Sequence, residues 1–136
     1  MKKYIFLCAV LFASAQLFAQ QASSTAKGPV ITFEKSTHDF GDIQQGDKVE
    51  HTFKFSNTGT EPLIITNVQV TCGCTVPAWP RDPIMPGQKS EITVAFNSAG
   101  KHGKQNKVVT VVSNAVNSDG GQISFTTNVL DRKPAQ

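Results

Sequence analysis

The sequence predicts an all-β protein, an immunoglobulin-like antiparallel β-sandwich of about seven strands. From Gly28 onward, apolar residues alternate with polar ones, which is the period of half-buried strands. Clusters of Gly, Asn and Asp separate the alternating segments at short intervals, as the turns of a sandwich do. No window of this region shows the 3.6-residue period of an amphipathic helix. A jelly roll or a small barrel is the alternative architecture.

The first half of the domain alternates between residues 30 and 70. Runs at 30–33 and 40–43 open it, and the second is bent at Gly41-Asp42. Every second residue of the next strand, 48–55, is suited to a buried face. A turn at 57–60 follows, in which Gly59 suits a positive φ. The alternation then slips in phase between 63–65 and 68–70, so we expect a β-bulge or a strand bend at Thr66–Asn67.

Residues 72–89 interrupt this pattern and are expected to form the longest irregular loop. Four prolines recur there at every third position, and proline fits neither a helix interior nor a central strand; they are Pro77, Pro80, Pro83 and Pro86. Alternation resumes at 92–96, and a polar hairpin tip is expected at 97–106. A β-branched run at 108–112, a polar turn at 114–121 and a last strand at 123–129 complete the domain.

The N-terminus has the layout of a secretory signal peptide. Lys2 and Lys3 precede nine apolar residues, 5–13, and a short polar-to-small region, 14–19, that contains one bulky residue, Leu17, near its end. Cleavage is expected after Ala19, with Ala15 as the alternative. The largely apolar stretch 4–19 is shorter than the ~20 residues that span a membrane, so the mature chain is expected to carry no transmembrane segment. The sequence therefore divides into a signal peptide (1–19), a flexible leader (20–28), one domain (29–130) and a polar tail (131–136), and the protein is expected to be secreted or periplasmic.

Composition argues against several classes of function. Charged residues make up 17% of the chain, below the ~25% of an average globular protein. Loss of Lys2 and Lys3 with the signal peptide lowers the net charge from +3 to +1, so we expect no nucleic-acid partner. With one Trp and one Tyr, a large aromatic-lined cofactor site is not expected, and no cofactor is predicted. Nucleophile-elbow, phosphate-loop and calcium-loop patterns are absent, so we expect a protein that is not an enzyme.

Cys72-Gly73-Cys74 is the sharpest candidate site. Signal cleavage would remove Cys8 and leave only this pair, in a compartment where thiols tend to oxidise. The two thiols could be buried small hydrophobes, a local disulfide, ligands of a soft metal such as Cu(I), or a link to another chain. A disulfide between residues two apart closes a small ring, which removes little chain entropy and is easily reduced.

The proline-rich loop carries a second candidate site. Trp79, Arg81 and Met85 lie on it, and Trp and Arg are the residue types that most often anchor interfaces. The alternative is that Trp79 covers an open end of the sandwich as part of the core, with Arg81 and Asp82 as a solvated neighbouring pair.

The remaining polar candidates favour structural roles. The cationic cluster Lys101, His102, Lys104 and Lys107 is expected to be a solvated patch. His51 shares the register of Val49 and Phe53, which favours a core or edge histidine over a metal ligand.

Five motifs follow one another in order along residues 31–129. They are His38-Asp39-Phe40-Gly41-x-Ile43, Phe53-x-Phe55-x-Asn57-Thr58-Gly59, Pro62-Leu63-x-Ile65, Cys72-Gly73-Cys74-Thr75 and Pro86-Gly87. Together they closely resemble the motifs of the bacterial domain-of-unknown-function family numbered 1573. The resemblance implies a single immunoglobulin-like sandwich akin to the major sperm protein, PapD and ASH/Hydin domains, with export and a non-catalytic binding role. The expected structural residues of these motifs are Phe40, Gly41, Phe53, Phe55, Asn57, Gly59, Pro86 and Gly87.

The expected function is that of an exported interaction module of a cell-envelope assembly, which binds a protein partner or an envelope component. A sandwich has exposed strand edges, and an edge can accept an extended segment of a partner through backbone hydrogen bonds. The alternative is a thiol-dependent module that binds a soft metal or exchanges a disulfide through Cys72 and Cys74.

Overall fold

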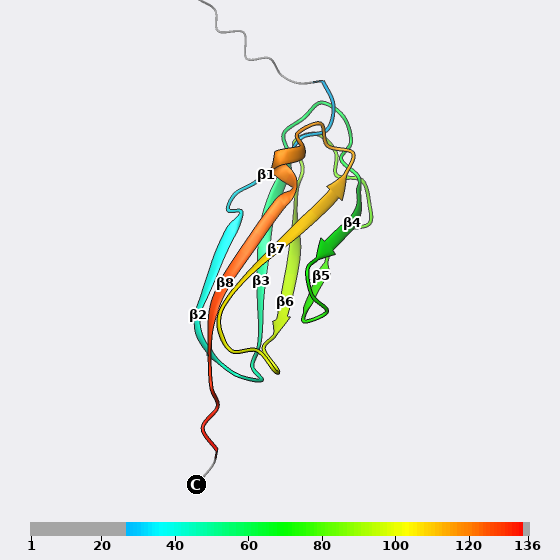
Figure 1. Ribbon diagram of the computed structural model, residues 1–136. Helices are drawn as coiled ribbons and strands as arrows, with labels where there is room; N and C mark the ends of the chain where they lie inside the picture. The colour runs from blue at the N-terminus through cyan, green and yellow to red at the C-terminus, as the bar shows by residue number, and fades with distance from the viewer. Residues whose placement is uncertain (1–26, 135–136) are drawn as a thin grey trace, which may run out of the picture.

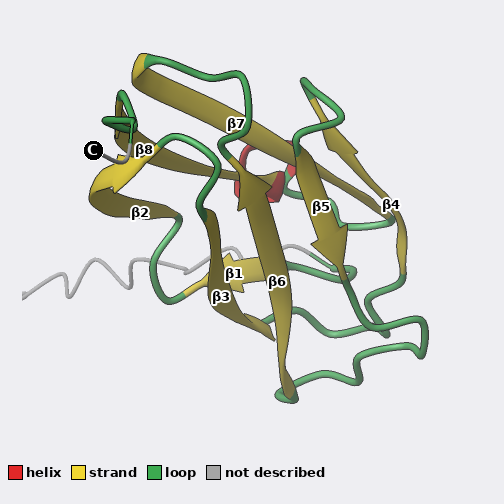
Figure 2. Cartoon of the chain, turned by 90° about the horizontal axis from the view of Figure 1, so that it is seen from below, coloured by secondary structure: helices red, strands yellow, loops and turns green. Residues whose placement is uncertain are grey.

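A computed structural model describes residues 27–134, without the side chains of residues 118 and 119. It contains eight strands in two four-stranded sheets that pack face to face (Figures 1 and 2). The predicted all-β, immunoglobulin-like sandwich is thus confirmed, with eight strands where about seven were expected. The predicted signal peptide, and the expected leader up to residue 26, lie outside the described residues.

The first sheet has the order β1-β3-β6-β5 and the second the order β2-β8-β7-β4. In the first sheet the strands are β1 (Ile31–Phe33), β3 (Lys48–Asn57), β6 (Lys89–Asn97) and β5 (Thr75–Ala78). In the second they are β2 (Thr37–Gln44), β8 (Gln122–Leu130), β7 (Gly103–Ser113) and β4 (Ile65–Val70). A 3-10 turn, η1 (Ser118–Gly121), precedes β8.

Neighbouring strands are antiparallel except for one pair. After β1 the chain leaves the first sheet and enters the second as β2, which runs parallel to β8. β1 therefore ends after three residues, although β3 beside it is ten residues long. Because of this difference in length, no strand among the described residues pairs with much of β3 on one side.

The alternating residues build the core between the sheets. The four fully buried phenylalanines come from three strands, and burial of each such side chain stabilises the fold by about 1.5–3 kcal/mol. They are Phe53, Phe55, Phe96 and Phe125. The predicted bulge is confirmed, because the β4–β7 register shifts between Ile65 and Asn67. A second shift separates Asp39 from Asp42 in β2, where Gly41 has a φ of +68°.

Two loop predictions are wrong in part. The proline-rich stretch 72–89 contains a strand, β5, at the edge of the first sheet, where Pro77 is tolerated because its nitrogen faces away from β6. The expected hairpin at 97–106 is not a hairpin: β6 and β7 belong to different sheets, and β7 already begins at Gly103. Period-two patterning marks strands but does not reveal which sheet each one joins.

The expected polar tail is attached to the body of the domain. Arg132 donates from Nε to the Gln45 carbonyl at 3.0 Å and from Nη2 to Asp47 at 2.9 Å. Among residues 27–134, no helix has the length and hydrophobicity needed to cross a bilayer.

Candidate interaction site

Asn57 is the centre of a buried hydrogen-bond network. Its side chain is 0% exposed, and Nδ2 donates to the carbonyls of Glu61 and Ile84 at 2.7 and 2.9 Å. Oδ1 accepts from the N–H groups of Gly59 and Val30 at 3.0 and 3.3 Å. All four hydrogen-bonding positions of the amide are used, so one side chain connects the residue before β1 to two loops.

Pro86 and Gly87 form a turn that docks on Asn57. Gln88 N–H donates to Met85 O at 2.9 Å, and Gly87 has a φ of +80°, as a type II turn requires of its third residue. Gly87 N–H donates in turn to the Asn57 carbonyl at 2.7 Å. The Pro-Gly motif is therefore part of the same structural network.

Gly59 is needed for space and not for a positive φ, which corrects the sequence-based expectation. Its φ is not among the positive values, whereas a Cβ at this position would collide with the Gly28 carbonyl oxygen and the Val30 nitrogen. Gly41 does have a positive φ, and its carbonyl accepts a 2.8 Å hydrogen bond from the buried hydroxyl of Thr127. Phe53 and Phe55 are buried, and Phe40 packs beside the core. The motif residues expected to be structural therefore form a structural framework.

Cys72 and Cys74 form a close pair at the turn between β4 and β5. Their sulfur atoms lie within bonding distance, and their Cα atoms are 5.3 Å apart. Thr75 N–H donates to the Cys72 carbonyl at 3.2 Å, which closes the turn. The φ of Gly73 is not positive, and a Cβ added there would meet no atom within 4 Å, so the turn does not depend on glycine at this position.

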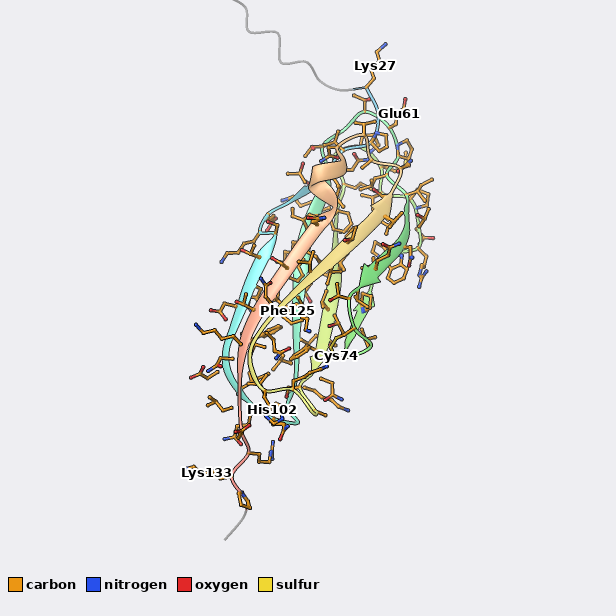
Figure 3. The ribbon with its side chains drawn as sticks, viewed as in Figure 1. Lys27, Glu61, Cys74, His102, Phe125 and Lys133 are labelled. Atoms are coloured by element: carbon orange, nitrogen blue, oxygen red, sulfur yellow. A yellow bond between two sulfur atoms is a disulfide. The ribbon has the colours of Figure 1, made fainter. Side chains whose placement is uncertain are left out.

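The cysteine pair borders a shallow hollow on the outer face of the first sheet. Lys48, Cys74 and Val76 line it, together with residues 95–97 of β6, and its volume is about 230 Å³. Val76 is 63% exposed. Cys74 lies toward the end of the molecule that also holds His102, opposite the end that holds Glu61 (Figure 3).

Trp79, Arg81 and Met85 do not form a single cluster of exposed anchors. The Trp79 ring packs against the core, and its buried Nε1 has no hydrogen-bond partner within the described residues. The Arg81 guanidinium carbon lies 3.9 Å from the Trp79 ring centroid, a cation–π contact. Met85 is 48% exposed on the neighbouring turn. The ring thus belongs largely to the core, and Arg81 stacks on it.

Two histidines from different sheets meet between β2 and β3. The His38 and His51 rings stack with centroids 3.6 Å apart and planes 7° apart. Phe40 lies edge-on to His38 at 4.6 Å, and Phe53 lies edge-on to His51 at 4.7 Å. Burial lowers the pKa of His51, and the nearby positive charges of His38 and Lys35 lower it further. The signal available in the sequence was a histidine two residues before an inward-facing phenylalanine in both strands.

No group of three or more His, Cys, Asp or Glu side chains in the described part of the chain could hold a metal ion. The expected cationic patch is partly paired: His102 Nδ1 lies 2.6 Å from Asp131. Lys104 lines a second hollow, of about 400 Å³, with Asp39 and Asp42 on the outer face of the second sheet.

The β1 edge is closed by a side chain. Ile31 turns its N–H and carbonyl away from β3, since the flanking residues Val30 and Thr32 bond to that strand. Asn117 Oδ1 accepts from Ile31 N–H at 3.0 Å, and Asn117 Nδ2 donates to Ile31 O at 2.8 Å. The carboxamide thus replaces a neighbouring strand at this residue.

The β5 edge lacks free donors. Cys74 O accepts from Asn97 N–H, so Cys74, Val76 and Ala78 face β6, and Thr75 and Pro77 face outward. The Thr75 N–H is bonded within the cysteine turn, and Pro77 has none. Proline at an exposed edge is a common way to prevent strand pairing.

Bulges interrupt the two outer edges of the second sheet. In β4 the bulge lies at Thr66, and the Val68 N–H is bonded to Asn67 Oδ1 at 2.9 Å. In β2 the irregularity at Gly41 follows only a few regularly paired residues, and Asp39 Oδ1 accepts the Gly41 N–H at 2.8 Å. Both edges therefore offer short, twisted templates.

The fold is shared with several solved structures. A protein of unknown function from Porphyromonas gingivalis W83 has a TM-score of 0.65 at 17% identity, over 79% of this chain and 50% of that one. An ASH/PapD-like domain of human CEP192 has a TM-score of 0.60 at 8% identity, over 76% of this chain and 87% of that one. The periplasmic chaperone SfaE has a TM-score of 0.50 at 10% identity, over 76% and 60%. These likenesses concern the fold alone, and this chain spans half of the Porphyromonas protein.

A comparison with curated proteins finds no sequence match. A family profile, in contrast, matches residues 31–129, which include every strand but the last residue of β8. The chain therefore belongs to the family described as "Protein of unknown function (DUF1573)".

Proposed function

We propose that this protein is an exported, non-catalytic interaction module that binds an extended segment of a partner protein along a sheet edge. The observation that carries the proposal is the difference in length between β1 and β3. β1 pairs with only three residues of β3, Phe55 to Asn57, so no described strand pairs with the rest of β3 on this side. An extended peptide gains backbone hydrogen bonds in such a place without any deep pocket.

Export to the periplasm or beyond the cell is part of the proposal. Its support is the sequence of the first 19 residues, with two lysines before a nine-residue apolar run. The close pair of Cys72 and Cys74 is in keeping with an oxidising compartment. The PapD-like fold supports an interaction role by analogy of fold.

The test is selection of ten-residue peptides from a random display library against the purified protein, followed by amide hydrogen exchange with the selected peptides. We expect binders that slow exchange at one sheet edge. If no peptide is selected, or if the selected peptides protect no edge amide, the proposed function is wrong.

A second candidate function uses the cysteine pair. Cys72 and Cys74 form a close pair with Cα atoms 5.3 Å apart, and such a pair can either exchange a disulfide or supply two thiolates to a soft metal such as Cu(I). Metal analysis of the purified protein and titration with a protein dithiol, with Cys72→Ser as the control, distinguish the two chemistries. A reversible couple that vanishes in Cys72→Ser would support exchange; its absence would remove this candidate.

A further inference from the structure

The unpaired part of β3 is the longest regular edge among the strands that the structure describes. β3 pairs with β6 over Lys48 to Ser56 without interruption. On its other side β1 covers Phe55 to Asn57, and Glu34 N–H extends that pairing to the Lys54 carbonyl. No described strand pairs with the remaining residues, 48–53, on this side.

The hydrogen-bond pattern shows which backbone groups face this open side. Asp47 O accepts from Ser98 N–H, and Asn57 N–H donates to Gln88 O, so the odd-numbered residues of β3 face β6. The even-numbered residues Lys48, Glu50 and Thr52 therefore direct their N–H and carbonyl groups away from β6. The described residues supply no hydrogen-bond partner for these groups, and neither a proline nor a bulge interrupts them.

The side chains of β3 define what an added strand must carry. Lys48 and Glu50 are exposed on the outer face of the first sheet, while Val49 and His51 point inward and are half-buried. Residues opposite each other in an antiparallel pair share one face and interact directly. An acidic residue therefore fits opposite Lys48, a basic one opposite Glu50, and small apolar ones opposite Val49 and His51.

β1 and the residue that follows it already show this side-chain complementarity, opposite Phe55 and Lys54 of β3. Phe33 lies opposite Phe55, with ring centroids 5.6 Å apart, on the inner face. The next residue, Glu34, bonds to the backbone of Lys54 and places its carboxylate 4.0 Å from Lys89 on the outer face. β1 thus ends on an apolar residue opposite an apolar one, and the acidic residue that follows the strand lies opposite a basic one.

We propose that Lys48–Thr52 of β3 binds an extended segment of a partner protein that runs antiparallel to β3 and continues the line of β1. From its N-terminal end the segment carries a polar, an apolar, a basic, an apolar and an acidic residue, opposite positions 52 to 48. The antiparallel direction follows from both present neighbours, since β1 and β6 each run antiparallel to β3. This inference rests on the proposed function and assigns its site and partner chemistry.

The probe is a synthetic peptide, acetyl-Ser-Thr-Val-Lys-Val-Glu-Ser-amide. The control is the same peptide with the positions of Lys and Glu swapped. Amide exchange followed by NMR should show at least tenfold slower exchange of Lys48, Glu50 and Thr52 at saturating probe. The control peptide, in which Lys and Glu are swapped, should have a dissociation constant at least fivefold higher than that of the probe. Equal binding of the two peptides would overturn the assigned chemistry.

Glu50→Pro removes a donor on the open side only, because Glu50 does not bond to β6. The amides of Val49 and His51, which bond to β6, should stay protected from hydrogen exchange, and probe binding should be lost. Thr37→Pro, its counterpart at the β2 edge, should bind the probe as the parent does. Where Glu50→Pro fails to fold, the double variant Lys48→Glu with Glu50→Lys decides, and should reverse the preference between the two peptides.

The results of these experiments distinguish the β3 site from the broader proposal that the protein binds an extended segment at some sheet edge. Protection by selected or synthetic peptides at Thr37 and Asp39 instead of β3 would overturn the β3 site and leave strand addition standing. Retained probe binding in a folded Glu50→Pro variant would overturn the β3 site as well. Failure of every selected peptide to protect any edge would overturn both.

Discussion

The His38 and His51 rings stack at a centroid distance of 3.6 Å, and they join the edge strand of the second sheet to β3 of the first. Two protonated imidazoles in this arrangement would repel each other, with Lys35 adding a third positive charge. The contact therefore depends on at least one neutral ring, and it lies at the seam where β1 ends.

Stability should fall as the pH is lowered through the range below the ordinary histidine pKa of about 6.5. The pKa of His51 is lowered in the folded protein, so in this range the unfolded chain binds the proton more readily. The loss should level off once the pH is below the folded-state pKa. The free energy of unfolding, obtained from urea denaturation between pH 7.5 and 5, measures this loss. His51→Phe should make the free energy of unfolding less dependent on pH, while the aromatic ring still stacks on His38. An unchanged pH dependence in His51→Phe would contradict this explanation.

Asn57→Ala should lower the free energy of unfolding by about 3 kcal/mol or more, because the Asn57 side chain is fully buried and backbone groups of four residues, among them the buried carbonyl of Ile84, lose a partner. Asn57→Asp, although isosteric, should be at least as damaging, since a carboxylate cannot donate to the Glu61 and Ile84 carbonyls. Chemical denaturation provides the measurement. The matched control is Asn128→Ala, which removes an exposed side-chain hydrogen bond to Asp42; it should change stability by less than about 0.5 kcal/mol.

How much of this could be predicted from the sequence depends on the range of the interaction. Alternation at Val49, Phe53 and Phe55 fixed which face of β3 is buried, and the phase slip at Thr66 located a bulge, because both are local properties of one strand. The short β5 was missed because Pro77 reads as a breaker until its nitrogen is known to face an open edge. The Asn117–Ile31 pairing joins residues far apart in the chain, and no local pattern specifies it. The spacing of His38 and His51 from a phenylalanine is a local pattern, but it does not show that the two strands face each other.

Gly59→Ala should destabilise the protein by about 2 kcal/mol or more. The added methyl group would strike backbone atoms of Gly28 and Val30, and backbone cannot yield as a flexible side chain does. Gly73→Ala serves as the control, because that position has open space and no positive φ, and it should be near neutral. Thermal unfolding of the two variants compares them directly. Similar melting temperatures for both would show that the segment 28–30 can shift at little cost.

Trp79→Phe should cost less than about 1.5 kcal/mol, since the buried Nε1 of Trp79 has no partner among residues 27–134 to lose. Trp79→Ala should cost about 2–3 kcal/mol, because it removes a ring that packs against the core. Denaturation followed by circular dichroism measures both, as Trp79 is the only tryptophan and its fluorescence is lost. A Trp79→Ala variant of unchanged stability would mean that the ring is free to serve as a binding anchor.

Asn117→Ala should open the β1 edge without unfolding the domain. Both backbone groups of Ile31 on the open side are bonded to the Asn117 carboxamide, and Gly120 leaves room for it, since a Cβ there would strike Asn117 Nδ2. Removal of the carboxamide should raise the exchange rate of the Ile31 amide at least tenfold, while the Thr32 amide, which faces β3, exchanges as before. A newly unpaired edge is also a template for association, so the variant should dimerise or aggregate at lower concentration than the parent. If Ile31 exchange is unchanged, β3 alone holds β1 in place, and the side-chain closure of this edge contributes nothing to its protection.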